Sequence, residues 1–369
     1  MASKALSFKE IYRIADSEGI GADVVSAGEL YTALAAGFPA KKLYFHGSAK
    51  TMREIRMGVE AGIGCFVVDN FGELDRISQV AGELGVTQHI LLRITPGIDP
   101  HTYEAVNTGR VDSKFGVAIE TGQAFEITQR ALRTPNVALD GFHCHIGSQI
   151  FEAEPFLTAV DIMTWYIADI RDRLGYTASV LNLGGGIAVP YVYRDPKIDL
   201  DAYIRAICEH LKERCEALSL PVPVVLMEPG RSTVADAGIT LYTVQNIKTI
   251  PGYKTYVAVD GGMTDNPRYA LYGAEHTAIV ANKAAEPADQ IVTIAGRCCE
   301  SDALIGENMS LQKAEVDDIV AVLVTGAYNY SMASNYNRVP RPPVVMLRDG
   351  EARVVVRRET LEDVAAYDL

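Results

Sequence analysis

Short apolar, β-rich runs alternate with stretches of helical periodicity over the first 235 residues. The apolar runs predict seven strands, at Ala22–Ser26, Leu43–His46, Cys65–Asp69, His89–Thr95, Gly141–Ile146, Val180–Leu183 and Val222–Glu228. Helical spacing between them predicts helices such as Phe8–Ser17, where Ser7 and Glu10 form a capping box, and Leu200–Leu218. This alternation of strands and helices predicts a parallel sheet.

Seven strands are one fewer than a closed (β/α)8 barrel contains. The chain opens with Met1–Ala5 and enters a helix at once, as though it began at the last residues of a first strand. We therefore expect an α/β domain over residues 1–235, a TIM-type (β/α)8 barrel that lacks most of its first strand. The expected reason is a missing N-terminal segment or a start assigned too late.

The pattern changes after Arg231, where apolar runs follow one another with turn signals between them. They predict strands at Ile239–Thr249, Tyr253–Val259, Gln290–Ala295, Asp318–Val324, Val344–Leu347 and Ala352–Arg357. Pro251-Gly252 and Asp349-Gly350 are typical of hairpin turns. Few helical stretches intervene, so residues 236–369 predict an antiparallel β domain.

Composition narrows the class of protein. A formal net charge of −13 argues against nonspecific nucleic-acid binding, which requires a basic surface. No apolar run reaches the roughly 18 residues of a membrane span, and the first residues do not resemble a signal peptide. The six cysteines have no metal-ligand spacing, so we expect no metal site and favour a reducing, cytoplasmic location.

Three motifs at successive strand ends suggest one cofactor pocket: His143–Gln149, Asn182–Gly186 and Glu228–Arg231. In a parallel barrel the carboxyl ends of the strands meet at one face. There His145 could stack on a pyridine ring, and the backbone N–H groups of Gly184, Gly185 and Gly186 could hold a phosphate together with Ser148. Each motif alone has a simpler explanation, a core histidine or a tight turn, but together they suggest pyridoxal 5'-phosphate (PLP).

A carboxylate and a lysine complete this prediction. Glu228 could keep a pyridine nitrogen protonated, although a salt bridge to Arg231 is the simpler alternative. PLP enzymes require a lysine at a strand end for the covalent bond to the cofactor. A lysine at position 4 is usually a solvated terminal charge, but Lys4 is where the shortened first strand would deliver one.

These residues resemble the fold-type III PLP-dependent decarboxylases, most closely the branch that acts on meso-diaminopimelate. The resemblance covers essentially the whole chain, and its most specific motif is Gly326–Asn337. It implies that Lys4 binds PLP covalently and that His145 stacks on its ring. It also implies the following further cofactor contacts: Ser148, Gly184, Gly185, Gly186, Glu228, Gly230, Arg231 and Tyr328.

The resemblance assigns the substrate to residues of the β domain together with Arg231 of the barrel domain. Arg231 and Arg268 would bind its distal carboxylate, with Tyr272 and Tyr328 beside them. Cys299, Glu300 and Ser301 would reach the site of a partner subunit, where Cys299 takes part in proton transfer and Glu300 reads the distal ammonium group. The family has a glycine between the residues equivalent to Ser301 and Asp302, which this chain lacks, and Tyr269 replaces a usual proline.

The implied reaction is decarboxylation of meso-2,6-diaminopimelate to L-lysine and CO2 by a cytoplasmic homodimer with shared active sites. The partners would be a small amino-acid substrate and a second subunit, with no nucleic acid or membrane. One alternative is a decarboxylase of the same fold for another basic amino acid or a carboxylated polyamine. Another is an inactive remnant, because an open barrel exposes an unpaired strand edge.

Overall fold

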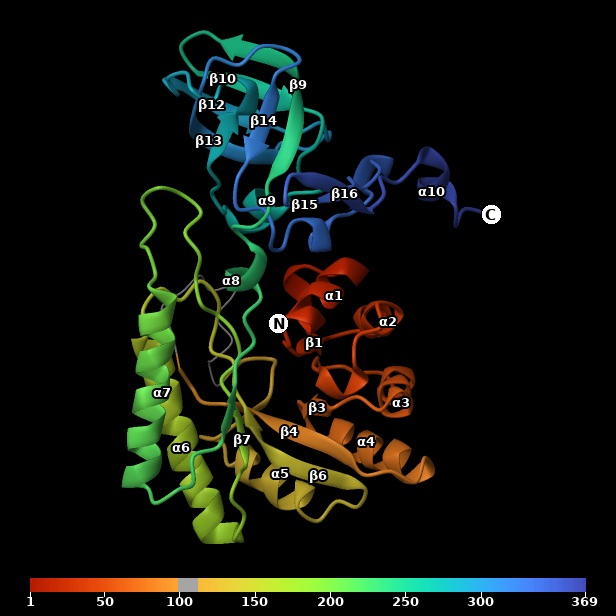
Figure 1. Cartoon of the computed structure of the whole chain (residues 1–369), viewed down its shortest axis with the longest axis vertical. Helices are drawn as coiled ribbons and strands as arrows, with labels where there is room; N and C mark the ends of the chain where they lie inside the picture. Colours follow the sequence, from red (N-terminus) through yellow and green to blue (C-terminus); the bar gives the residue numbers. More distant parts are fainter. Residues whose placement is uncertain (99–111) are drawn as a thin grey trace. The chain divides into compact units, whose positions relative to one another are not determined.

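The computed structural model describes residues 1–98 and 112–369, and the chain divides into two compact units (Figure 1). The first unit comprises Met1–Ala188 and Lys197–Gly230. The second comprises Val189–Pro196 and Arg231–Leu369. A short segment from within the first 235 residues therefore groups with the C-terminal part of the chain.

The first unit is built on a parallel sheet with the order β1-β2-β3-β4-β6-β7-β8, and β5 pairs with β4. Its strands are β1 (Ala22–Val24), β2 (Leu43–Phe45), β3 (Cys65–Val68), β4 (Gln88–Thr95), β5 (Val117–Ala118), β6 (Val137–His143), β7 (Val180–Asn182) and β8 (Val224–Leu226). Its α-helices are α1 (Lys9–Ser17), α2 (Ala27–Ala35), α3 (Met52–Ala61), α4 (Phe71–Glu83), α5 (Gln123–Ala131), α6 (Glu154–Leu174) and α7 (Leu200–Ala217). The two longest, α6 and α7, pack side by side (Figure 1). All seven predicted strands are confirmed to within a few residues.

The first residues of the chain join the two ends of this sheet. Ala2 pairs with Asp23 of β1 in a parallel bridge, and the N–H of Asp23 donates to the carbonyl of Met1 at 2.9 Å. The N–H of Ala2 donates to the carbonyl of Pro229, just beyond β8, at 3.0 Å. A single bridge thus occupies the place of a first strand, which confirms the predicted barrel. The 3₁₀ turn Ser3–Ala5, which contains the exposed Lys4, follows directly.

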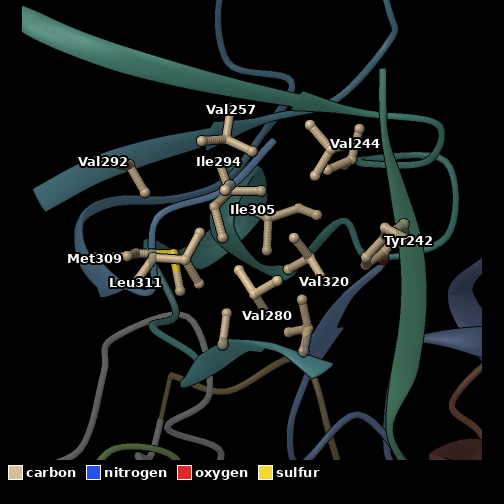
Figure 2. Packing of buried hydrophobic residues seen from close by; sticks show 14 residues of the cluster. Tyr242, Val244, Val257, Val280, Val292, Ile294, Ile305, Met309, Leu311 and Val320 are labelled. Atoms are coloured by element: carbon tan, nitrogen blue, oxygen red, sulfur yellow. The ribbon is translucent and has the colours of Figure 1, made fainter. Parts of the chain in front are cut away.

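The second unit contains a six-stranded sheet with the order β11-β14-β9-β10-β12-β13 and a separate hairpin of β15 and β16. The strands are β9 (Thr240–Ile250), β10 (Lys254–Val259), β11 (Ala278–Val280), β12 (Gln290–Ala295), β13 (Leu304–Leu311), β14 (Ile319–Val322), β15 (Val344–Arg348) and β16 (Glu351–Val356). Three short helices, α8 (Arg231–Val234), α9 (Arg268–Tyr272) and α10 (Leu361–Ala365), complete it. Side chains from all six strands of the larger sheet, including Val257, Ile294 and Ile305, converge in one apolar core (Figure 2).

The predicted antiparallel β domain is confirmed with one exception: β10 and β12 pair in parallel, with Tyr256 opposite Thr293. One local prediction was wrong. The predicted capping box of the first helix is absent: α1 begins one residue later, and its N-cap, Phe8, has no side-chain cap. The hydroxyl of Ser7 lies instead 3.2 Å from the phenol oxygen of Tyr12, so it contacts a side chain of α1 and does not cap the helix.

Candidate active site

The three strand-end motifs lie side by side in the first unit. The N–H of Cys144 donates to the carbonyl of Asn182 at 2.8 Å, which joins the first motif to the second. The N–H of Glu228 donates to the carbonyl of Gly184 at 2.9 Å, which joins the second to the third. The prediction that these segments share one edge of the sheet is therefore confirmed.

Three consecutive glycines allow this close approach. A Cβ on Gly185 would stand 2.2 Å from the carbonyl oxygen of Glu228, and one on Gly184 would stand 2.6 Å from that of Cys144. Gly186 has φ +125, and its Cβ would stand 2.5 Å from the carbonyl oxygen of Gly147. No other residue fits these positions without moving backbone. The loop is therefore more than a tight turn, since it gathers the backbone of three motifs at one place.

Glu228 lies in a polar cluster built from several strand ends. The Nε2 atoms of His46, just beyond β2, and of His143, the last residue of β6, each lie 3.1 Å from its Oε1. The side-chain amide of Asn182 donates to the same Oε1 at 2.7 Å. Asp23 of β1 lies 3.6 Å from Nε2 of His46. The carboxylate is thus fixed from three directions, with 12% of its side chain exposed.

The protonation states within this cluster follow from burial and charge. Burial alone would raise the pKa of Glu228, but the neighbouring His46 and His143 outweigh it and hold the pKa well below its usual value. Burial alone would lower the pKa of His46, but the charge of Glu228 and contacts with Asp23 raise it to about 9. Burial lowers the pKa of His143 to about 4. At neutral pH the cluster therefore holds one ion pair, His46–Glu228, and a neutral His143.

Lys4 and His145 belong to the same unit and interact electrostatically. Lys4 is exposed, and its charge lowers the pKa of His145. Burial is the larger cause, and together they place the pKa of His145 well below its usual value. His145 is consequently a neutral aromatic ring, which suits stacking on a second ring. Ser148 is half-buried five residues beyond β6, and Gly230 packs against Ala2 and Ala5 near Lys4.

In the second unit, the predicted substrate residues form a cluster of two arginines and several tyrosines. Cζ of Arg268 lies 5.7 Å from the ring centroids of both Tyr272 and Tyr328. Cζ of Arg231 lies 4.7 Å from the Tyr328 centroid. Both arginines are buried, and within the described residues Arg268 has no ion pair. Two buried cations amid electron-rich rings form a site suited to an anion.

The remaining predicted residues lie on an exposed segment of the second unit. Cys299, Glu300 and Ser301 are all solvent-exposed, between β12 and β13. The phenol of Tyr336 donates to the Glu300 carboxylate, and the N–H of Cys299 donates to Oδ1 of Asn337 at 3.4 Å. The segment is therefore tethered to the motif Gly326–Asn337.

Four residues in these clusters were not predicted as site residues: His46, His143, Asn182 and Tyr191. His143 and Asn182 are the first residues of two predicted motifs and His46 ends a predicted strand, so their positions were a usable signal. Tyr191 is different. Its phenol accepts a hydrogen bond from Nη1 of Arg231 at 2.7 Å, and no motif marks it.

The residues present fit PLP. The glycines bring backbone of three motifs together at the strand ends, the ionised Glu228 supplies the acceptor that a protonated pyridine nitrogen needs, and Lys4 is exposed. Among the described residues, the cluster around Glu228 could also hold a metal ion, since the ligand atoms of His46, His143 and Glu228 lie within 4.8 Å of one another. A metal would require neutral His46, whose raised pKa of about 9 opposes this.

Comparison with known proteins agrees with this chemistry. Residues 1–235 match the family described as pyridoxal-dependent decarboxylase, pyridoxal binding domain. The chain is 48% identical to a diaminopimelate decarboxylase of Bacillus methanolicus over 99% of its own length and 84% of the relative's. It is 46% identical to that of Bacillus subtilis over 100% of its own length and 84% of the relative's.

Solved structures give the same result. The structure of diaminopimelate decarboxylase from M. jannaschii in complex with L-lysine matches with a TM-score of 0.92 and 37% identity, covering 100% of this chain and 83% of the other. The enzyme from Helicobacter pylori, also with L-lysine, matches with a TM-score of 0.90 and 33% identity, covering 99% and 88%. In the described part of the chain, every helix is too short or too polar to cross a lipid bilayer.

Proposed function

The chain belongs to the pyridoxal-dependent decarboxylases and, among them, to the diaminopimelate decarboxylases, and on this premise we propose that it converts meso-2,6-diaminopimelate to L-lysine and CO2. The observation that carries the proposal is the pairing of two kinds of site in one chain. An ionised Glu228 stands among parallel strand ends, and a buried arginine pair lies in the β unit. The first suits a pyridine cofactor, and the second suits a substrate that carries an additional carboxylate.

Residues of the first unit, together with Arg231 and Tyr328 of the second, would hold the cofactor. Lys4 would form the covalent bond to its aldehyde, and the loop of Gly184–Gly186 with Ser148 would bind its phosphate. Gly230, Arg231 and Tyr328 are the further cofactor residues of the proposal. The neutral ring of His145 would stack without adding positive charge. Glu228, kept anionic by His46, would hold a proton on the pyridine nitrogen.

Bound PLP supplies an electron sink for the electron pair released when the bond from Cα to the carboxylate breaks. The surrounding residues would control the proton that replaces CO2. Cys299 would deliver this proton from Sγ to Cα, which is the role that the family resemblance implies for it. Because this thiol lies on an exposed segment, we assign it to the active site of the second subunit of a homodimer.

The arginine pair would select the substrate. Arg231 and Arg268 would bind the distal carboxylate in the planar geometry that guanidinium groups favour, with Tyr272 and Tyr328 around them. Glu300 and Ser301 would recognise the distal ammonium group. All six cysteines are free thiols, which supports a reducing, cytoplasmic location.

Lys4→Ala tests the proposal directly. The wild-type protein with PLP should release CO2 and L-lysine from meso-diaminopimelate, and Lys4→Ala should lose this activity by several orders of magnitude because the covalent anchor is gone. Borohydride should fix the yellow chromophore to the wild type but not to the variant. Lys9→Ala, an exposed lysine at the start of α1, is the matched control and should keep full activity.

The same assay separates the alternatives. Preferential turnover of ornithine, arginine or carboxynorspermidine would replace the proposed substrate with another basic one. A folded protein that takes up no PLP would indicate an inactive remnant. Full activity in Lys4→Ala would refute the scheme itself.

A further inference from the structure

Tyr191, like Tyr328, lies beside both arginines of the cluster in the second unit. Its phenol oxygen accepts the hydrogen bond from Nη1 of Arg231 at 2.7 Å, and its ring centroid lies 5.7 Å from Cζ of Arg231. Cζ of Arg268 lies 5.5 Å from the same centroid. Only 7% of Tyr191 is exposed. One side chain therefore contacts both guanidinium groups.

The two arginines need such a mediator because they repel each other. Burial, followed by the charge of Arg231, lowers the pKa of Arg268. Nε of Arg268 is buried and, within the described residues, donates no hydrogen bond. An aromatic face attracts a cation by its quadrupole and brings no competing negative charge. The Tyr191 ring thus holds the cations while leaving Arg268 donors for a ligand.

Tyr191 is itself held in place from two sides. The hydroxyl of Thr277 donates to the backbone carbonyl of Tyr191 at 3.1 Å. The ring of His276 meets the Tyr191 ring edge-on, with centroids 5.1 Å apart and an interplanar angle of 85°. Burial, with the charges of Arg268 and Arg231, lowers the pKa of His276 to about 4, so this neighbour is neutral and adds no third cation.

We propose that Tyr191 is a positioning residue that makes the arginine pair selective for a carboxylate. Its hydroxyl occupies one N–H of Arg231 and fixes the plane of that guanidinium, while its ring fixes Arg268. The remaining N–H groups are then oriented before a ligand arrives, which lowers the entropy cost of binding. The inference rests on the proposed function for the identity of the ligand, the distal carboxylate of the substrate.

L-Lysine and cadaverine provide the test, because both carry two amino groups and only L-lysine carries a carboxylate. Inhibition of meso-diaminopimelate turnover by each is measured with the PLP-loaded enzyme. In Tyr191→Phe, L-lysine inhibition should weaken about tenfold to a hundredfold, as expected for loss of a hydrogen bond to a charged group, and cadaverine inhibition should not change. KM for meso-diaminopimelate should rise by a similar factor, with a smaller change in kcat.

Tyr176→Phe is the matched control. It removes a phenol hydrogen bond of 2.8 Å to the carbonyl of Leu139 in the first unit. Inhibition by L-lysine and by cadaverine should therefore stay unchanged. Thr277→Val is a second variant, which removes the hydrogen bond to the backbone carbonyl of Tyr191. It should weaken inhibition by L-lysine and not by cadaverine, to a lesser extent than Tyr191→Phe. It keeps the test decisive if Tyr191→Phe folds poorly, which thermal unfolding of each variant will show.

The inference would be overturned if the folded variants lost inhibition by L-lysine and by cadaverine to the same extent, or if neither inhibition changed. A wild-type enzyme that does not decarboxylate meso-diaminopimelate would instead remove the proposed function. If the wild-type enzyme decarboxylates meso-diaminopimelate and Tyr191→Phe leaves the inhibition by L-lysine and cadaverine unchanged, only the proposed role of Tyr191 is refuted.

Discussion

Two histidines at the same distance from one carboxylate oxygen have opposite pKa shifts. His46 and His143 both lie 3.1 Å from Oε1 of Glu228, yet the pKa of His46 rises to about 9 and that of His143 falls to about 4. The difference lies in their other neighbours. His46 also contacts Asp23, whereas the positive charges of His46 and Arg93 lower the pKa of His143. Of the two histidines, His46 is therefore the protonated one, and this follows only from the residues that surround each ring in the folded structure.

The pKa of His46 predicts a pH-dependent contribution to stability. Its folded pKa of about 9 lies above its unfolded value of 6.5, so the stabilisation is complete below pH 6.5 and is lost as pH rises through 9. The difference in Tm between wild type and His46→Asn should therefore be a few degrees at pH 6.5 and should narrow toward pH 9. Scanning calorimetry at a series of pH values measures it.

His89→Asn is the control for this series. His89 is 55% exposed and lies 3.0 Å from Asp140, so its removal should cost little at any pH. A Tm difference for His46→Asn that stays constant or widens with pH would contradict the assigned ion pair.

At the scale of elements, the glycine loop after β7 is constrained by packing. The three glycines permit contacts with the backbone of two other strand ends, and the proposed function assigns the phosphate of PLP to the same loop. The sequence correctly placed this loop at a strand end. It did not predict that Gly185 lies against the carbonyl of Glu228, because that contact depends on the pairing of β7 with β8.

Gly185→Ala should disrupt this element. The added Cβ would lie 2.2 Å from the Glu228 carbonyl oxygen, so β7 and β8 must separate at their ends. We expect a loss of several degrees in Tm and at least a tenfold weaker affinity for PLP, measured by calorimetry and by titration of the cofactor absorbance.

Gly62→Ala separates the steric effect from the backbone effect. Gly62 ends α3 at φ +66 with nothing within 4 Å of its Cβ position, so the substitution should cost only about 1 kcal/mol of backbone strain. Its PLP affinity should equal that of the wild type. Equal PLP affinity in Gly185→Ala would show that the loop does not form the phosphate site.

At the scale of the whole molecule, the proposal of a dimer with shared sites makes a quantitative prediction. Lys4→Ala and Cys299→Ala homodimers should each be nearly inactive, for different reasons. Subunits mixed under exchange conditions should form hybrids with one intact site, so activity should recover to about a quarter of wild type at equal ratio. Decarboxylase assays of the mixture against each variant alone measure this recovery, and its absence would place Lys4 and Cys299 in one subunit's site.

The sequence by itself determined the order of elements, the barrel and the placing of three motifs at one edge. These follow from local periodicity and from the rule that parallel strands end on the same side. Tertiary structure alone decided the remainder: the parallel pairing of β10 with β12, the histidines around Glu228, and Tyr191 between the arginines. Such contacts join residues distant in the chain, and their register, burial and protonation arise only once the elements pack.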